Sequence, residues 1–524
     1  MSTRRPKGML WAAVAGVVGA GVYLAVCEAV ALLVAPGANP VLDVAGSIID
    51  VVPRPVKEFA ISAFGTADKP VLVASVGVAA FIGAAVAGVL QLRRPPWGVA
   101  VLGLGAAAAL AAVVTRPGAA MLTPLAPAAG TLAGCFVLAV LVARLRAWLG
   151  LPGRDETGEP AGSSGRGRAA VDRRAFFVLT AAAAVSAAAI GLGARLADGA
   201  RTSVEAVRGA LRLPTPPAVE VPAGAELGIR GLSLLYTPND AFYRVDTALE
   251  VPVVDPAAWR LVVDGLVDEP LDLSFDEMIG KGLQEYSITL TCVSNEVGGD
   301  LVGTARWWGV PVRDILRMAR PQDGADMVLS RSVDGFTAST PLEALTDDGI
   351  DAILAVAMNG EPLPLEHGFP VRMVVPGLYG YVSATKWLTR LTVTTFAEDE
   401  AYWTPRGYAA RAPVKLSSRM DTPRPGSRVA AGRVALAGVA WAQTVGIERV
   451  EVSIDDGPWT AAELSAPVNA DTWVQWTIPW DAEPGTHYVS VRAVDRNGQV
   501  QIEERSPIAP DGSTGWQRTL LTVV

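Results

Sequence analysis

The sequence predicts a multidomain protein with three parts: an all-α transmembrane bundle of about five helices, a mixed α+β domain, and a C-terminal β-sandwich. Three observations lead to this prediction. The chain has 524 residues, too many for one ordinary domain, and 51% of them are hydrophobic, a high share for a soluble protein. Long apolar segments near the N-terminus account for this excess. Short β-branched runs follow them, and the C-terminal residues alternate apolar and polar side chains.

The N-terminal part contains apolar segments that predict membrane-spanning helices. A helix needs about 20 residues to cross the hydrocarbon core. Buried helices of a soluble core rarely run so long without charge, so we prefer the membrane interpretation. We expect four spans within residues 1–148 and a fifth within residues 173–198. The apolar segments are residues 9–34, 70–92, 97–114, 126–148 and 175–196.

Basic residues predict the orientation of these spans. They gather before the first span, between the second and third, and between the fourth and fifth. Loops rich in Lys and Arg are cytoplasmic, so five spans place the C-terminal part outside the cytoplasm. The residues are Arg4, Arg5, Lys7, Arg93, Arg94, Arg144, Arg146, Arg154, Arg166, Arg168, Arg173 and Arg174.

The segment around the fifth span predicts a linker, an anchor and a tether. Residues 149–172, rich in Gly, Arg, Glu and Ser, predict a flexible cytoplasmic linker. The following stretch, Asp172-Arg-Arg-Ala-Phe-Phe-Val-Leu179, resembles a twin-arginine export signal, although plain positive-inside anchoring explains the same arginines. Residues 199–224 predict a tether that is stiff and extended in its proline-rich stretch, Leu213 to Pro222.

The remaining chain predicts two further domains. Residues 225–408 alternate short β-branched runs with short helical patterns, which is typical of a mixed α+β domain. Asn359-Gly360, after the run from Ile353 to Met358, predicts a hairpin. Residues 409–524 show alternation of period two in several runs, such as Val450, Val452 and Ile454. This spacing predicts a small β-sandwich of the immunoglobulin type, without that fold's disulfide.

Cys292 is the main candidate for chemistry. It follows the apolar run Ile288 to Thr291, whereas Cys27 and Cys135 lie in apolar segments where cysteine acts as a small hydrophobe. Cys292 therefore has no evident disulfide partner. From the residues alone it is a nucleophile, a ligand to a soft metal, or a buried thiol without chemistry.

The surroundings of Cys292 favour the metal. The stretch from Thr237 to Arg411 resembles the molybdenum-cofactor domain of the sulfite oxidase family, in which a cysteine thiolate ligates molybdenum beside the dithiolene of a pterin. Seven matching pieces occur in the order of the family. They are Thr237-Pro-Asn-Asp-Ala-Phe-Tyr-Arg, Trp259-Arg-Leu-Val-Val-Asp-Gly265, Thr289-Leu-Thr-Cys-Val-Ser-Asn295, Ala305-Arg-Trp307, Asn359-Gly-Glu-Pro-Leu363, His367-Gly-Phe-Pro-Val-Arg372 and Lys386-Trp-Leu388.

The resemblance implies a set of cofactor-binding residues. His367 and Arg372 would contact the pterin, and Lys386 would offer a positive charge to its phosphate; imidazole, guanidinium and ammonium groups all suit such hydrogen bonding. The other members hold family positions along the same pocket, although an Asn in Pro-Asn-Asp is equally typical of a turn. These are Asn239, Tyr243, Arg244, Asn295 and Arg306.

Departures from the family pattern make sulfite doubtful as the substrate. In animal and plant sulfite oxidases an Asn-Arg-Arg stretch follows the cysteine, and an arginine precedes the asparagine that Asn239 matches. This sequence has Glu296 and Val297 after Asn295, and Pro238 before Asn239. Losing cationic donors weakens binding of a dianion. Tyr402 matches the tyrosine of those enzymes across a gap, and Arg406 would supply a replacement charge near it; both are candidate catalytic residues.

We therefore expect a membrane-anchored oxidoreductase with molybdenum and a mononuclear molybdopterin, which transfers oxygen atoms in two-electron steps outside the cytoplasm. The chain has no Cys-x-x-Cys-His motif and no cysteine cluster, so neither haem nor an iron–sulfur cluster is predicted, and electrons would pass to a separate cytochrome or quinone system. The C-terminal domain resembles the one with which the family forms homodimers. A net charge of -8 argues against nucleic acid as a partner.

Two other functions remain open from the sequence. One is reduction of methionine sulfoxide or another S-oxide, which is the same chemistry in reverse. The other is a non-enzymatic binding or assembly module outside the cytoplasm that retains the fold. The metal site is the same for an oxidase and a reductase, so the sequence does not separate them.

Overall fold

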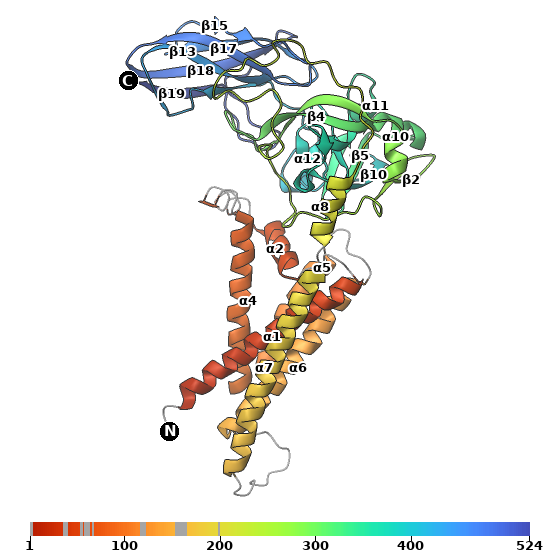
Figure 1. The fold of residues 1–524 in the computed structure, drawn as a ribbon, viewed down its shortest axis with the longest axis vertical. Helices are drawn as coiled ribbons and strands as arrows, with labels where there is room; N and C mark the ends of the chain where they lie inside the picture. Colours follow the sequence, from red (N-terminus) through yellow and green to blue (C-terminus); the bar gives the residue numbers. More distant parts are fainter. Residues whose placement is uncertain are drawn as a thin grey trace. The chain divides into compact units, whose positions relative to one another are not determined.

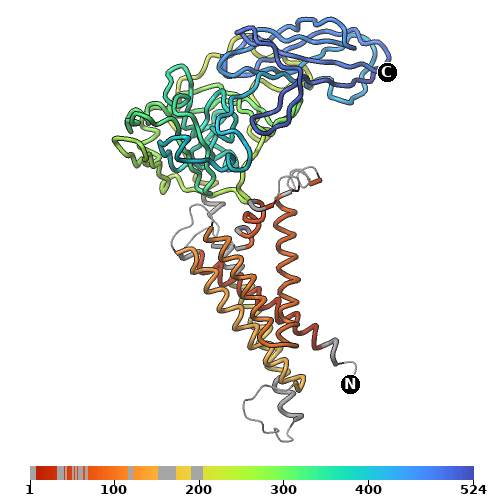
Figure 2. Tube along the Cα trace, turned by 180° about the vertical axis from the view of Figure 1, so that it is seen from behind, coloured from red at the N-terminus to blue at the C-terminus, as the bar shows by residue number. Residues whose placement is uncertain are grey.

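The computed structural model describes residues 4–34, 40–52, 56, 63–64, 68–115, 122–151, 165–197 and 200–524. The chain forms two compact units, Met1–Arg201 and Thr202–Val524. The first unit is helical, and the second is rich in β-structure (Figures 1 and 2).

The first unit is built from long apolar helices. Helix α1 packs against α4, α6 and α7. Gly16 and Gly88 allow α1 and α4 to approach closely, because a Cβ on either glycine would overlap a backbone carbonyl of the other helix. Helices α1, α4, α5, α6 and α7 are long and apolar enough to cross a membrane, which confirms the five apolar helices expected from the sequence. The helices are α1 (Arg4–Val34), α2 (Pro40–Val51), α4 (Asp68–Arg93), α5 (Trp97–Val114), α6 (Leu125–Leu149) and α7 (Gly165–Ala197).

The expected linker and tether are more helical than predicted. Of the linker, residues 152–164 lie outside the described residues, and α7 already begins at Gly165. Within the tether, α8 (Ala200–Ala210) is helical because it has a surface to pack on. Its Val204 joins a buried cluster with Phe242 and Trp307, and the Arg208 Nε donates to the carbonyl oxygen of Leu363 at 2.9 Å.

The middle of the chain forms two sheets with short helices. One sheet has the strand order β2-β1-β10-β5-β6, and the other has the order β3-β4-β7-β8, with β9 also paired to β7. The strands are β1 (Arg260–Gly265), β2 (Leu271–Ser274), β3 (Gln284–Thr291), β4 (Val302–Pro311), β5 (Met327–Ser332), β6 (Thr337–Pro341), β7 (Ile353–Met358), β8 (Glu361–Pro362), β9 (Arg372–Val374) and β10 (Leu388–Thr394). The helices are α9 (Phe275–Ile279), α10 (Val312–Ala319), α11 (Leu342–Thr346) and α12 (Gly380–Ser383).

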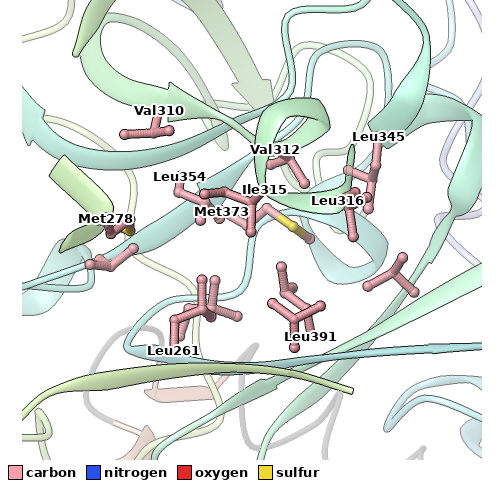
Figure 3. Close-up of a cluster of buried hydrophobic side chains, with 14 of the residues drawn as sticks. Leu261, Met278, Val310, Val312, Ile315, Leu316, Leu345, Leu354, Met373 and Leu391 are labelled. Carbon is pink, nitrogen blue, oxygen red and sulfur yellow. The ribbon is translucent and has the colours of Figure 1, made fainter. Parts of the chain in front are cut away.

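A large apolar core lies among these elements. Figure 3 shows Leu261 and Leu391, from β1 and β10, near Ile315 of α10 and Met373 of β9. All four side chains are fully buried. The predicted hairpin is confirmed: β7 and β8 pair in antiparallel fashion, and the turn residues Asn359 and Gly360 have φ values of 53° and 86°.

The C-terminal part contains two further sheets, with strand orders β11-β13-β17-β16 and β12-β19-β18-β14-β15. A buried cluster containing Leu436, Trp476 and Val491 joins them. In β17 both Val474 and Trp476 contribute to this cluster. The strands are β11 (Ser417–Thr422), β12 (Arg428–Val429), β13 (Gly432–Trp441), β14 (Ile447–Ile454), β15 (Thr460–Ala461), β16 (Glu463–Leu464), β17 (Val474–Ala482), β18 (Gly485–Asp495) and β19 (Gln517–Val523).

Candidate functional site

A cleft of about 910 Å³, including the part open to solvent, lies at the end of β3. Segments far apart in the sequence form its walls. It is therefore a tertiary feature of the mixed α+β region rather than of one loop. The lining residues fall within 242–247, 292–294, 332–336, 367–387 and 403–408.

Cys292 lies in this cleft, directly after the last residue of β3. Its backbone N–H donates to the carbonyl oxygen of Leu301 at 2.9 Å, and its own carbonyl accepts from the N–H of Asn295 at 3.0 Å. These bonds form a tight turn that fixes the direction of the thiol. The Sγ atom accepts one long hydrogen bond, from the N–H of Ser294 at 3.4 Å. Burial raises the pKa of the Cys292 thiol, and the Ser294 bond partly offsets this.

Arg372, on β9, brings a buried positive charge to the same cleft. Its side chain donates to the carbonyl oxygens of His367 (3.2 Å) and Ala384 (3.5 Å), and lies 5.2 Å from the centre of the Trp307 ring. The Nε atom is buried without a hydrogen-bond partner, and among the described residues no carboxylate forms an ion pair with Arg372. Burial lowers the pKa of Arg372 to about 10. A buried, unpaired cation fits an anionic ligand.

His367 is held in one tautomer. Its Nε2 lies 3.0 Å from the carbonyl oxygen of Asn239, and because a carbonyl only accepts, Nε2 carries the proton and Nδ1 is an acceptor. The residue is 3% exposed. Burial, and next the nearby Arg372, lower the pKa of His367 to about 4, so its ring is neutral at pH 7.

We expect replacement of His367 by glutamine to flatten the pH dependence of stability. Below the ordinary pKa of 6.5 the unfolded chain binds a proton that the folded chain excludes until about pH 4. The unfolding free energy should therefore fall by about 3 kcal/mol as the pH drops through this window. Denaturation midpoints measured from pH 4 to 7 test this. His487→Gln is the control, because that partly buried ring has a raised pKa beside Asp455 and should change the curve in the opposite direction.

Lys386 lies in the cleft but already has a counter-ion. Its Nζ donates to the Asp246 carboxylate at 2.6 Å and to the carbonyl oxygen of Glu366 at 2.9 Å. The Asp246 side chain is only 4% exposed. Burial lowers the pKa of Lys386 to about 8, although Asp246 opposes the shift. Arg372 therefore remains as the buried cation of the cleft without a counter-ion in the described chain.

The structure brings together some of the predicted site residues. Cys292, Tyr243, His367, Arg372 and Lys386 all line the cleft. Burial and then the Cys292 thiolate raise the pKa of the Tyr243 hydroxyl, whereas Arg372 lowers it, so these three groups are neighbours.

Four other predicted residues lie outside the lining. The Asn239 amide donates to Glu361 at 2.6 Å, and the Asn295 side chain accepts from the N–H of Leu301 at 2.9 Å. Both amide side chains are therefore engaged in hydrogen bonds within the protein. Arg244 pairs with Asp246 at 2.9 Å. The guanidinium of Arg306 lies 5.4 Å from the centre of the Tyr236 ring.

Tyr402 and Arg406 are also absent from the lining of the cleft. The Arg406 guanidinium stacks 3.7 Å from the centre of the Tyr402 ring and donates to the Tyr402 carbonyl oxygen at 2.6 Å. The 3₁₀ turn at Thr404–Arg406 and the left-handed Gly407 reverse the chain there. As a result, Trp403 and Tyr408 line the cleft instead.

Sequence reasoning missed the aromatic part of the cleft. Trp403 and Tyr381 each contact Tyr408, with ring centres 5.2 Å and 5.5 Å apart. Phe336 and Asp334, from the β5–β6 turn, complete this wall. The aromatic-rich stretch from Tyr402 to Tyr408 was a visible signal, but an irregular segment has no period to show which rings face inward.

Comparisons with known proteins found similar sequences and a similar solved structure. The family described as oxidoreductase molybdopterin binding domain matches residues 248–403. Sulfite oxidase of Gallus gallus is 31% identical over 335 residues, which cover 54% of this chain and 72% of that protein. Mitochondrial sulfite oxidase of Mus musculus is 32% identical, over 55% of this chain and 62% of that protein. The sulfane dehydrogenase SoxCD of Paracoccus pantotrophus is a solved structure with a TM-score of 0.45 and 23% identity, covering 52% of this chain and 77% of that one.

The chain is thus a molybdopterin-dependent oxidoreductase. It belongs to the sulfite oxidase family and is an enzyme of that family. The cofactor is molybdenum with molybdopterin, and the cleft fits it in two respects. A buried free thiol is available as a soft ligand, and the unpaired Arg372 suits the negative charge of the pterin phosphate and dithiolene.

Proposed function

We propose that the protein is a membrane-anchored molybdenum enzyme that transfers an oxygen atom to or from a small substrate outside the cytoplasm. The observation that carries this proposal is the presence of the free thiol of Cys292 and the unpaired guanidinium of Arg372 in one cleft. When bound, the cofactor supplies two-electron redox chemistry at molybdenum. Cys292 would ligate the metal, and Arg372 and His367 would hold the pterin.

The chain's own residues have distinct roles in this proposal. Arg372 binds the anionic group, and His367 presents its Nδ1 as a hydrogen-bond acceptor because Asn239 fixes its tautomer. The Tyr243 hydroxyl, whose raised pKa keeps it protonated, can donate a hydrogen bond into the cleft near Cys292. The aromatic wall, formed by Phe336, Tyr381, Trp403 and Tyr408, would exclude water from the reacting atoms.

Metal analysis and a substrate screen test the enzyme proposal together. The purified full-length chain should contain about one molybdenum per chain and should turn over one substrate class with redox dyes as electron acceptor or donor. The screen should include sulfite, sulfoxides, N-oxides and nitrate. A folded, fully active protein without molybdenum would refute the proposal.

Sulfite should be a poor substrate. Lys386 and Arg372 both line the cleft, and Lys386 is already paired with Asp246. Neither Arg244 nor Arg406 lines the cleft. Each missing charge-assisted hydrogen bond forfeits about 1.5 to 3 kcal/mol of anion binding, so two would weaken affinity on the order of a hundredfold or more. Steady-state sulfite oxidation measures this. A low micromolar KM with fast turnover would show that the argument is wrong.

The aromatic wall favours a second candidate, reduction of an S-oxide such as methionine sulfoxide. Phe336, Tyr381, Trp403 and Tyr408 offer apolar ring faces, and Asp334 adds a carboxylate that disfavours anions. A neutral substrate with an apolar body suits this lining better than a dianion. Trp403→Ala should therefore raise KM for a neutral sulfoxide by roughly tenfold, in line with about 1.5 kcal/mol of aromatic contact. An unchanged KM would argue against a substrate at this wall.

The membrane topology follows from the basic loops. We expect the N-terminus and the segment around Arg166 to be cytoplasmic, and residues after about 200 to lie outside. Electrons would then pass to a cytochrome or a quinone system, and the C-terminal sheets, an immunoglobulin-type sandwich in this proposal, would form a homodimer. Reporter fusions after residue 151 and at the C-terminus test the topology. A C-terminal fusion that reports from the cytoplasm would rule out the five-span arrangement.

A further inference from the structure

The strand that leads to Cys292 has an edge without a strand partner in its own sheet. In the order β3-β4-β7-β8, the one strand that pairs with β3 among the described residues is β4. The other edge is bonded to the C-terminal part instead. The Thr289 N–H donates to the Asp471 carbonyl oxygen at 2.9 Å, and the Asn469 amide donates to the Ser287 carbonyl oxygen at 2.9 Å. The Gln443 amide also donates to the carbonyl oxygen of Thr289.

The loop that follows Cys292 is held from the same side. The Ser513 hydroxyl donates to the carbonyl oxygen of Asn295 at 2.7 Å, and Arg419 Nη1 donates to the carbonyl oxygen of Gly299 at 2.7 Å. Between these two points Gly298 has a φ of 82° and lies against the Gln517 side chain. The side chain of Gln517 is itself fixed, because its Oε1 accepts from the N–H of Met420 at 2.6 Å.

Arg419, which donates to Gly299, is itself held in place by several bonds. Arg419 is 8% exposed, and its Nε forms an ion pair with Asp421 at 2.6 Å. Its Nη2 donates to the Ser233 hydroxyl at 2.9 Å. All three nitrogen atoms of this guanidinium therefore form hydrogen bonds, so the loop cannot shift without breaking charge-assisted hydrogen bonds.

We propose that the C-terminal all-β part positions the Cys292 thiolate for molybdenum, with Ser513 and Arg419 as the positioning residues of its loop. This inference rests on the proposed role of Cys292 as the metal ligand. The turn between Cys292 and Leu301 carries the ligand, and anchors before and after it restrict its movement. A catalytic group displaced by about 1 Å can lose on the order of a hundredfold in rate, so such anchoring has a direct effect on chemistry.

A pair of matched serine variants tests the proposal in the full-length, molybdenum-loaded enzyme. Ser513→Ala removes one hydroxyl bond to a backbone carbonyl at the Cys292 loop. Ser453→Ala removes a bond of the same kind, to the carbonyl oxygen of Gly457 at 2.8 Å, elsewhere in the C-terminal sheets. Ser513→Ala should speed amide hydrogen exchange in residues 293–301 on the order of fivefold. It should also shift the Mo(V) paramagnetic resonance signal, which reports the geometry of the sulfur ligand, and lower kcat more than it changes KM. Ser453→Ala should change none of these.

The readouts separate the possible failures. If Ser513→Ala leaves both exchange and the Mo(V) signal as in the parent, the proposal is wrong. Faster exchange with an unchanged Mo(V) signal would also overturn it, because the loop would then be held without positioning the ligand. Arg419→Lys provides a second variant with its charge retained, and it should give the same pattern as Ser513→Ala. A parent protein without molybdenum would refute the proposed function, while the exchange rates would still show whether Ser513 holds the loop.

Discussion

Replacing Cys292 with serine should lower kcat/KM by roughly a hundredfold or more while the fold is retained. Loss of a residue that only supports a metal ligand typically costs 10- to 100-fold in metal affinity or activity, so loss of the ligand itself should cost at least as much. A serine hydroxyl is a hard, weakly acidic donor and cannot replace a soft thiolate on a metal that is bound by sulfur. It can, however, accept the bond from the Ser294 N–H, so the turn should persist.

The measurement is steady-state turnover of the substrate found in the dye screen, together with molybdenum content and the Mo(V) signal. Activity is the sharper readout, because the pterin dithiolene can retain some metal without the thiolate. Cys27→Ser and Cys135→Ser are the matched controls, since both of these cysteines are free and lie in the apolar helices α1 and α6. Full activity of a folded, molybdenum-loaded Cys292→Ser variant would contradict the proposed role of the thiol.

Local patterns were enough to predict the apolar helices and the hairpin turn. Long apolar segments have one stable solution in a bilayer, so the helices α1, α4, α5, α6 and α7 could be located from composition alone. The Asn359-Gly360 turn was equally easy to predict, because few residue pairs accept two positive φ values in succession. The helix α8 was missed because its stability comes from a tertiary contact, the packing of Val204 on a distant cluster.

Only those site residues that belong to motifs along the chain could be predicted from the sequence. Cys292, His367 and Arg372 could be identified from motifs, but the pairing of Lys386 with Asp246 joins residues 140 positions apart and has no local signal. The positions of Tyr402 and Arg406 were also beyond prediction. Their stacking on each other depends on a reversal of the chain at Gly407, which decides which aromatic rings face the cleft.

Replacing Arg372 with methionine should have opposite effects on the cofactor-free and the cofactor-loaded protein. In the cofactor-free chain the guanidinium is a buried charge without a counter-ion among the residues that the structure describes, and burial lowers its pKa to about 10, which means that the charge disfavours folding. Methionine has a similar length and no charge. The variant should therefore unfold at an equal or higher temperature, with a gain of about 1 kcal/mol, since the lost bonds to the carbonyl oxygens of His367 and Ala384 offset part of the benefit.

The loaded protein should show the reverse. If Arg372 meets an anionic group of the pterin, its removal forfeits about 1.5 to 3 kcal/mol for each charge-assisted hydrogen bond, so molybdenum retention should fall about tenfold to a hundredfold. Molybdenum content after dialysis and thermal unfolding with and without cofactor measure both effects. Arg260→Met is the control, because Arg260 is in the same domain, half exposed and paired with Asp272, and should change neither quantity appreciably. A variant that keeps its molybdenum but loses stability in the cofactor-free state would assign Arg372 to the fold, and His367 would then be the next candidate for holding the pterin.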